Sequence, residues 1–176
     1  YINDNGGAKG IGADNGPLRD NKGSTYEGGI RVPMILAGPG IPVNGSYHQP
    51  VHSMDILPTC LAAAGEAVPA DIEGVNLLPY LDGTVTTPPH ETIAIRFGSN
   101  CSLRKGDWKI VKSANGSGGF ELYNLVNDIS ETTDLAGSEP EKLAELRHEY
   151  TEFEARNEKP RHATLGKTAS TINQND

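Results

Sequence analysis

The chain opens with a long polar stretch and then carries short apolar runs, and these runs decide which elements the sequence predicts. Residues 4–29 are rich in Gly, Asn and Asp and have no hydrophobic period, which is typical of a functional or disordered loop. The apolar run 30–38 predicts a buried strand. Residues 53–65 predict a short, mostly buried helix, with Asp55 as its N-cap and Gly65 as its C-terminal stop.

The second half of the chain has a different pattern, in which short apolar runs alternate with turns. These runs predict four strands, at residues 92–97, 101–104, 108–112 and 120–125. A final helix is predicted to begin at Ser138, where Ser138 and Glu141 would form a capping box. Its apolar side chains recur at helical spacing, so we expect one face to pack on the sheet: Leu143, Leu146, Tyr150 and Phe153.

This change of pattern predicts a division into three parts. The Thr and Pro residues at 86–89 are typical of a boundary. We therefore expect one structural part at residues 1–86 and a subdomain of antiparallel strands and a helix at 87–158. Residues 159–176 are polar and aperiodic, and are expected to form a tail.

Composition limits the partners of the chain. Its 176 residues carry a formal charge of −8, so general attraction to nucleic acid or anionic lipid is not expected. No apolar run approaches the roughly 20 residues that cross a bilayer, so no membrane span is expected. The chain starts at Tyr1 without a Met or a signal-like segment, and we expect a piece of a longer protein. Of the two cysteines, Cys60 is predicted to be a small buried hydrophobe.

The first candidate site is the sequence Asp4-Asn5-Gly6-Gly7. A carboxylate followed by an amide at the end of a strand offers two hard oxygen donors, which suit Ca²⁺ or Mg²⁺. Asp-Asn-Gly is also a common turn sequence. From these residues alone, a plain turn is the stronger interpretation.

The second candidate is Lys22, which lies in a loop bordered by glycines. An ammonium group there can contact a sulfate or phosphate oxygen without crowding it, although a solvated surface lysine is the simpler interpretation. Candidate nucleophiles are poor, because Ser24 and Ser53 lack the Gly-x-Ser-x-Gly elbow. Residue chemistry alone therefore indicates a loop suited to anions and metals on an α/β scaffold.

Five stretches carry a recognisable pattern: Ile2-Asn3-Asp4-Asn5-Gly6-Gly7, Gly16-Pro17-Leu18-Arg19 with Lys22-Gly23-Ser24-Thr25-Tyr26-Glu27-Gly28-Gly29-Ile30-Arg31-Val32-Pro33, His52-Ser53-Met54-Asp55-Ile56-Leu57-Pro58-Thr59, Gly106-Asp107-Trp108-Lys109-Ile110-Val111, and Glu121-Leu122-Tyr123-Asn124-Leu125. Together and in this order, they resemble the C-terminal portion of the type I, formylglycine-dependent sulfatases, the arylsulfatase family. Five blocks in the same order are not accidental.

The resemblance implies an α/β fold of the alkaline-phosphatase-like sulfatase type. The chain would supply the last part of the large α/β domain and a small C-terminal antiparallel sheet covered by a helix. The implied reaction is hydrolysis of a sulfate ester, either a small aryl sulfate or a sulfated sugar, by a formylglycine whose hydrated form attacks sulfur. An extracytoplasmic location (periplasmic, secreted or lysosomal) is implied by the resemblance only.

The resemblance also implies roles for three residues of this chain. Asp4 and Asn5 match metal ligands of the family, for a divalent cation that is usually Ca²⁺, with Mg²⁺ as the other choice. Lys22 matches the lysine that contacts the sulfate, where a fixed cation stabilises charge on the ester oxygens in the transition state. Lys22 is thus expected to be both a substrate-binding and a catalytic residue.

The chain also departs from the family pattern. The formylglycine motif and the early paired aspartates, which belong to the family's N-terminal half, are absent from the sequence. We therefore expect the isolated chain to be inactive, poorly stable and dependent on the N-terminal part of the same protein. Asp20 and Asn21 stand where small residues are expected. Two alternatives stay open: a phosphonate or phosphate monoester hydrolase of the same superfamily, and a non-catalytic module that binds a sulfated glycan.

Overall fold

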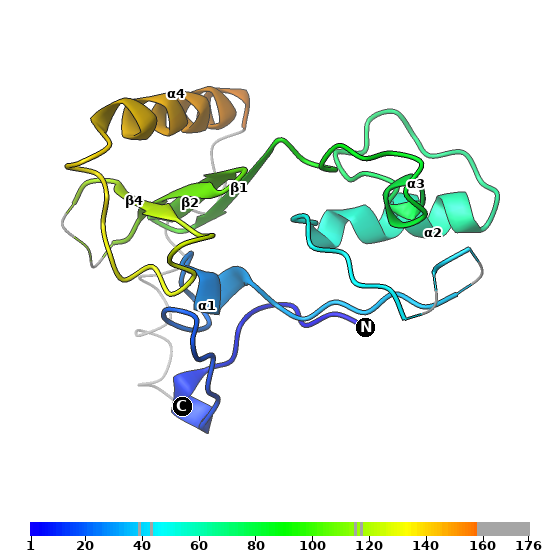
Figure 1. Cartoon of the computed structure of the whole chain (residues 1–176), viewed down its shortest axis with the longest axis horizontal. Coiled ribbons are helices and arrows are strands. Elements are labelled where there is room, and N and C mark those ends of the chain that lie inside the picture. The colour runs from blue at the N-terminus through cyan, green and yellow to red at the C-terminus, as the bar shows by residue number, and fades with distance from the viewer. Residues whose placement is uncertain (39, 43, 115, 117, 158–176) are drawn as a thin grey trace, which may run out of the picture. The chain divides into compact units, whose positions relative to one another are not determined.

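The contacts of the chain group its residues into two compact units (Figure 1). The computed structural model describes residues 1–38, 40–42, 44–114, 116 and 118–157. The first unit holds Tyr1–Gly6 and Arg31–Ile93, and the second holds Gly7–Ile30 and the chain from Ala94 onward. The boundary predicted at residue 86 stays a prediction, and the predicted tail at 159–176 lies outside the described residues.

The second unit is built on a four-stranded sheet whose strands follow one another in sequential order: β1 (Thr92–Phe97), β2 (Asn100–Lys105), β3 (Trp108–Lys112) and β4 (Glu121–Asn124). β3 pairs antiparallel with both β2 and β4, so that Leu103, Ile110 and Leu122 lie side by side across the sheet. Gly106, with φ of 56°, makes the tight turn between β2 and β3. The four predicted strands are confirmed.

Helix α4 (Pro140–Arg156) covers one face of this sheet (Figure 1). The buried cluster between them joins strand and helix residues: Cys101, Leu103, Ile110, Leu122, Leu146 and Tyr150. The predicted packing of the helix is therefore confirmed. The predicted capping box is wrong, because the helix begins at Pro140 and Ser138 belongs to the preceding turn, where its hydroxyl donates to the Leu135 carbonyl (3.2 Å).

The polar stretch near the N-terminus covers the opposite face of the sheet. It contains the short helices η1 (Lys9–Ile11) and α1 (Glu27–Ile30). Side chains alternate between the two faces of a strand. Ile110 therefore joins the cluster under α4, whereas its neighbour Val111 packs with Tyr26. A stretch without hydrophobic periodicity thus forms an ordered layer on the sheet.

The first unit has less regular structure. It contains η2 (Ser53–Asp55), α2 (Ile56–Ala63) and α3 (Leu78–Leu81). The strand predicted at residues 30–38 is wrong, since among the described residues its only ladder contact is an isolated antiparallel bridge between Ile2 and Met34. Beyond this bridge, the described residues provide no paired strand along this segment. A strand needs such a paired neighbour to form a ladder.

The helix predicted near Asp55 is confirmed as α2, which is followed by Gly65 at φ 78°. Its predicted burial is wrong. Pro58 and Thr59 are buried, but Leu57 is 56% exposed and Cys60 is exposed, because the first unit covers only one side of the helix. Among the described residues, no helix is both long enough and apolar enough to span a bilayer.

Candidate functional site

Asp4 and Asn5 follow the short paired segment at the start of the first unit. The Tyr1 ammonium donates to the Ile35 carbonyl and the Ile35 N–H donates back to the Tyr1 carbonyl, each at 2.8 Å. This pairing and the Ile2 bridge hold the chain extended up to Asn3. Asp4 is exposed and Asn5 is half-buried. Neither side chain forms a hydrogen bond or ion pair with the described residues, so their oxygens are available to a ligand.

These two oxygen donors fit a hard cation by their chemistry, but they do not complete its shell. Ca²⁺ takes about six to eight oxygen ligands. Within the described part of the chain, no three His, Cys, Asp or Glu side chains gather into a metal site. By themselves, Asp4 and Asn5 offer one carboxylate and one amide group, fewer ligands than such a shell takes.

Lys22 belongs to the second unit, in a loop that closes back on Gly7. The Lys22 N–H donates to the Gly7 carbonyl (3.1 Å). The side-chain amide of Asn15 donates to the Gly7 carbonyl (2.9 Å) and to the Asp20 carbonyl (3.2 Å). Its amide oxygen accepts the Gly7 N–H (2.8 Å). The backbone beside Lys22 is thus fixed, while its side chain is exposed and makes no ion pair with the described residues.

The backbone at Asp20 accounts for the small residue that the resemblance leads us to expect at this point of the loop. Its φ is 68°, in the left-handed region that glycine adopts without strain and that Asp tolerates better than most residues. Its carboxylate accepts a hydrogen bond from the Asn21 amide (2.8 Å). The aspartate therefore keeps a backbone shape that glycine would also allow.

Helix α1 follows the Lys22 loop and packs directly against it. The Gly28 N–H donates to the Arg19 carbonyl (2.8 Å). A Cβ at Gly28 would lie 2.4 Å from that carbonyl oxygen, and one at Gly29 would lie 2.2 Å from the Ser24 carbonyl oxygen. These approaches leave room only for hydrogen. The two glycines thus let the loop and α1 pack as one piece.

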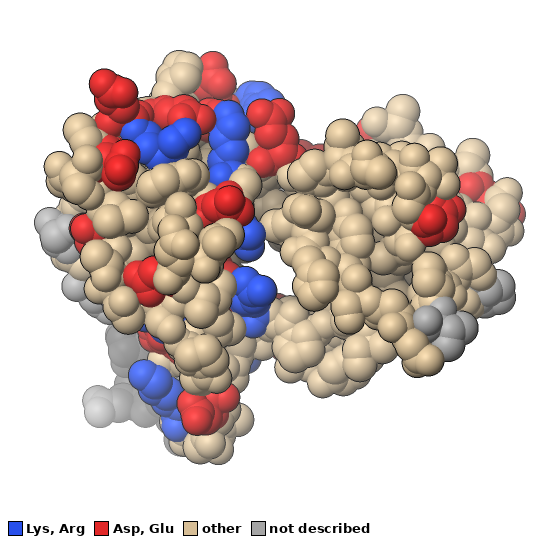
Figure 2. All heavy atoms as spheres, in the orientation of Figure 1, with Lys and Arg blue, Asp and Glu red and all other residues tan. Residues whose placement is uncertain are grey.

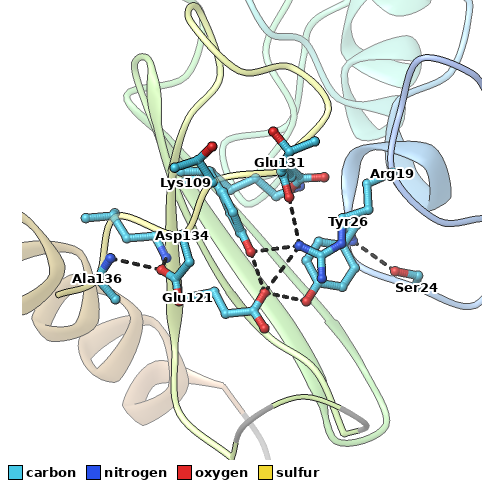
Figure 3. A network of polar contacts seen from close by, with 12 residues as sticks. Arg19, Ser24, Tyr26, Lys109, Glu121, Glu131, Asp134 and Ala136 are labelled. Carbon is cyan, nitrogen blue, oxygen red and sulfur yellow. Dashed lines mark hydrogen bonds and ion pairs between the residues drawn. The ribbon is translucent and has the colours of Figure 1, made fainter. Parts of the chain in front are cut away.

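Arg19 connects the loop to the sheet (Figure 3). Its guanidinium donates to the Tyr123 hydroxyl (2.7 Å) and to the Glu131 carbonyl (2.8 Å), and lies 3.9 Å from the centre of the Tyr26 ring. Both tyrosine hydroxyls donate to the Glu121 carboxylate. Burial and this carboxylate raise the pKa of Tyr26 and Tyr123, so both phenols stay protonated donors.

A buried ion cluster lies beside this network, with Lys109 at its centre. The Lys109 ammonium is 2.8 Å from a Glu27 carboxylate oxygen and 2.9 Å from a Glu131 carboxylate oxygen. The second Glu131 oxygen accepts the Glu27 N–H (2.7 Å). Burial raises the pKa of Glu131, against the opposing effect of Lys109. Charges this deep are retained only when paired and hydrogen-bonded.

The first unit has its own buried polar cluster around Asp55. This carboxylate accepts the N–H groups of His52 (2.7 Å) and Val75 (2.9 Å), and both its oxygens lie 2.9 Å from His90 Nε2. Asp55 was predicted to cap α2, but its side chain makes no such bond. His52 caps η2 instead, with Nδ1 accepting the Met54 N–H (3.1 Å). The cluster joins distant segments and has no exposed nucleophile.

None of the nucleophile candidates gains an activating partner within the described residues. The Ser24 hydroxyl accepts the Tyr26 N–H (3.1 Å), which is a turn contact. Burial raises the pKa of the Cys101 thiol, which disfavours the reactive thiolate.

Sequence reasoning also missed Lys109, which lies in β3, an inner strand of the sheet, where a buried lysine is unusual. That mismatch was the available signal.

Comparison with known proteins decides what these residues belong to. The model of the Sulfatase family matches residues 1–66. A sulfatase of Formosa agariphila is 31% identical over 160 residues, which cover 80% of this chain and 29% of that protein. The chain belongs to the sulfatase family. Arylsulfatase K of Xenopus laevis is 31% identical to this sulfatase chain over 139 residues, covering 71% of the chain and 26% of the relative.

Solved structures bear out the fold of this sulfatase chain. The structure of Ps i-CgsB, in complex with k-i-k-neocarrahexaose, superposes with a TM-score of 0.79 at 31% identity, over 92% of this chain and 37% of that one. A phosphonate monoester hydrolase of Silicibacter pomeroyi shares the fold alone, with a TM-score of 0.61, 20% identity, and coverage of 77% and 31%. The predicted alkaline-phosphatase-like sulfatase fold is therefore confirmed. The chain spans under a third of the length of the two curated relatives.

Proposed function

We propose that this chain is part of a sulfuric ester hydrolase, to which it supplies two metal ligands and one sulfate-binding lysine. The observation that carries this proposal is that the sulfatase match over residues 1–66 includes Asp4, Asn5 and Lys22. The side chains of all three are unpaired among the described residues, as a site that receives a cation and an anion requires.

Asp4 and Asn5 would hold a divalent cation, with Ca²⁺ as the proposed ion and Mg²⁺ as the alternative. Sulfatases in general depend on a metal and a formylglycine. A carboxylate and an amide oxygen suit a hard cation better than zinc. When bound, the cation would neutralise negative charge on the sulfate oxygens. The remaining ligands would come from the N-terminal part of the same protein.

Lys22 would act on the sulfate group itself. Its loop is fixed by backbone hydrogen bonds while its ammonium is free, so a point charge can reach a sulfate oxygen without refolding the loop. An ammonium aimed at the ester oxygens stabilises the charge that builds in the transition state. The attacking formylglycine would lie outside this sequence, so we expect the chain alone to be inactive.

The substrate would be a small aryl sulfate or a sulfated sugar. A sugar substrate is supported by the oligosaccharide that the relative Ps i-CgsB binds. We expect the enzyme to work in an extracytoplasmic compartment (periplasm, lysosome or outside the cell), where polymeric sugars are accessible.

Hydrolysis of 4-nitrophenyl sulfate by the full-length protein tests the proposal. Lys22→Ala should lower kcat/KM by about 10²-fold to 10³-fold, the usual loss when one group that stabilises the transition state is removed. Lys9→Ala, which truncates an exposed lysine of the same segment, is the matched control and should leave kcat/KM unchanged. Removal of divalent cations by a chelator should abolish turnover, and Ca²⁺ should restore it. Equal activity of Lys22→Ala and wild type would refute the role of Lys22.

Two other functions give different outcomes in the same assay. A phosphonate or phosphate monoester hydrolase, a reaction known from the relative of Silicibacter pomeroyi, would cleave 4-nitrophenyl phenylphosphonate faster than the sulfate ester. A non-catalytic module would bind a sulfated oligosaccharide without cleaving either ester. The proposal predicts a preference for the sulfate ester.

A further inference from the structure

We infer that Lys109 is a positioning residue for Lys22: the buried cluster of Lys109, Glu27 and Glu131 fixes the loop that presents the lysine to the sulfate. The inference rests on the proposed function of Lys22. Lys109 itself is buried, and its ammonium is paired with the Glu27 and Glu131 carboxylates. Its effect on the reaction would pass through the loop alone.

The first step is that Glu27 and the Lys22 loop form one structural piece. Glu27 is the first residue of α1 and follows Lys22 by five positions. Gly28 donates to the Arg19 carbonyl across the loop, and the Ser24 N–H donates to the Asn21 carbonyl (3.1 Å). At Gly28 and Gly29, α1 packs so closely on the loop that even a Cβ would not fit between them. A displacement of Glu27 therefore displaces the loop.

The second step is that Lys109 ties Glu27 to an inner strand of the sheet. Lys109 is the second residue of β3, which is paired on both sides, and its side chain is 1% exposed. Away from water, the attraction between its ammonium and the Glu27 carboxylate is screened little. The ion pair thus fastens the start of α1 to the sheet.

The third step is a second anchor on the other side of Lys22. Arg19 precedes Lys22 by three residues and donates to the Glu131 carbonyl, while the Glu131 carboxylate holds both Lys109 and the Glu27 N–H. Both ends of the loop therefore converge on Glu131. Its φ of 51° is unusual for a residue with a long side chain, and such a conformation persists where the surroundings hold it from several sides.

Together the two anchors fix the backbone around a lysine whose own side chain stays free. A group misplaced by about 1 Å can cost on the order of 10²-fold in rate, even when the altered residue lies far from the chemistry. The cluster thus gives the C-terminal sheet a role in the reaction, through the position of the loop.

The test is a double-mutant cycle in the full-length enzyme, with 4-nitrophenyl sulfate as substrate. Lys109→Met keeps the length of the side chain and removes the charge, and should lower kcat/KM by about 10-fold to 10²-fold. Because Lys109 acts through Lys22, the double variant Lys22→Ala with Lys109→Met should be no slower than Lys22→Ala alone. Lys112→Met, an exposed lysine on the same strand, is the matched control and should leave kcat/KM unchanged.

Hydrogen exchange provides a readout that does not depend on turnover. In Lys109→Met, the amides of Lys22, Ser24 and Gly28 should exchange at least 10-fold faster, whereas those at the centres of the strands should not change. If Lys109→Met fails to fold, Tyr123→Phe is a milder variant. It removes the hydroxyl that receives the Arg19 guanidinium, and should show the same lack of additivity with Lys22→Ala.

The outcomes separate this inference from the proposed function. Losses that multiply in the double variant, together with unchanged exchange in the loop, would overturn the positioning role and leave the role of Lys22 intact. A Lys22→Ala enzyme with full activity would overturn both. A large loss in Lys22→Ala, no further loss in the double variant, and faster exchange confined to the loop would support the inference.

Discussion

The two units of this chain differ in how much of their own apolar surface they bury. In the described residues, the buried apolar side chains of the second unit form two clusters, one on each face of the sheet. Among the described residues, the first unit contributes only Leu77 and Pro58. Its large apolar side chains are instead well exposed, among them Tyr1 at 74%, Ile35 at 62% and Leu57 at 56%.

Charge follows the same division. By sequence, the first unit carries seven acidic residues and one basic residue, Arg31, whereas the second carries most of the charged residues of the chain, of both signs. In the face shown in Figure 2, the part that contains α2 and α3 is almost free of charged side chains. Burial of apolar surface is the main force that stabilises a folded chain. We therefore expect the second unit to be the stable one and the first to depend on further contacts.

The largest effect expected from this difference is on core substitutions. Leu122→Ala in the second unit should cost about 2–5 kcal/mol of unfolding free energy, because a fully buried leucine leaves a cavity. Leu57→Ala in the first unit should change it by less than about 0.5 kcal/mol. Urea unfolding followed by the fluorescence of Trp108, the single tryptophan, measures the first value directly. Equal costs for the two substitutions would contradict the comparison.

A smaller effect is expected at the polar centre of the first unit. Asp55→Asn should weaken the hydrogen bonds to His52, Val75 and His90, at a cost of about 1.5–3 kcal/mol, because these bonds involve a buried charge. The loss should appear as faster hydrogen exchange at the Val75 amide. The Trp108 transition, which reports the second unit, should not move. A shift in that transition would mean that the units are not independent.

The pH dependence of the first unit should follow His52. Burial lowers the pKa of His52 below its ordinary value of 6.5. The Asp55 charge opposes this shift in the pKa, and His90 adds to it. The stability that neutral His52 provides is therefore fully present above about pH 6.5 and is lost as the pH falls through the lower folded pKa. Protonation also removes the acceptor for the Met54 N–H, a cap worth about 1 kcal/mol.

His52→Asn is the control for that prediction, because an asparagine can cap the helix without titrating in this range. Amide exchange at Met54, followed between pH 7 and pH 5, should accelerate in the wild type more than in the variant. Identical profiles for the two proteins would contradict the assignment to His52.

The smallest effect is expected at the surface of the second unit. Arg96 and Glu154 form an ion pair at 2.9 Å, but both side chains are partly exposed to solvent. Arg96→Ala should therefore cost less than about 1 kcal/mol, and less still in high salt. A loss as large as that of Leu122→Ala in the Trp108 transition would show that burial is not what sets stability in this unit.

The contrast between the units also explains what the sequence could predict. The four strands and the packing of α4 were predictable because their apolar side chains repeat at the periods of strands and helices. The segment at 30–38 was as apolar as a strand, but a strand also needs a partner. Likewise, Cys60 was predicted to be buried because its neighbours in the sequence are apolar. It is exposed, since burial of α2 also depends on what covers the helix.

Long-range polar contacts were beyond sequence reasoning. Asp4, Asn5 and Lys22 could be singled out by resemblance, and the roles assigned to them stay predictions. The contacts of Arg19 with Tyr123 and of Glu27 with Lys109 join residues that are far apart in the chain. No local period records such pairs, and only a lysine within an apolar strand pointed toward them.

A crystal structure of the full-length protein with Ca²⁺ and inorganic sulfate would test the account most directly. We predict a cation within about 2.3–2.6 Å of the Asp4 carboxylate and the Asn5 amide oxygen. The Lys22 ammonium should lie within about 2.7–3.2 Å of a sulfate oxygen. A cation and a sulfate bound elsewhere, with these three side chains facing solvent, would contradict the proposed site.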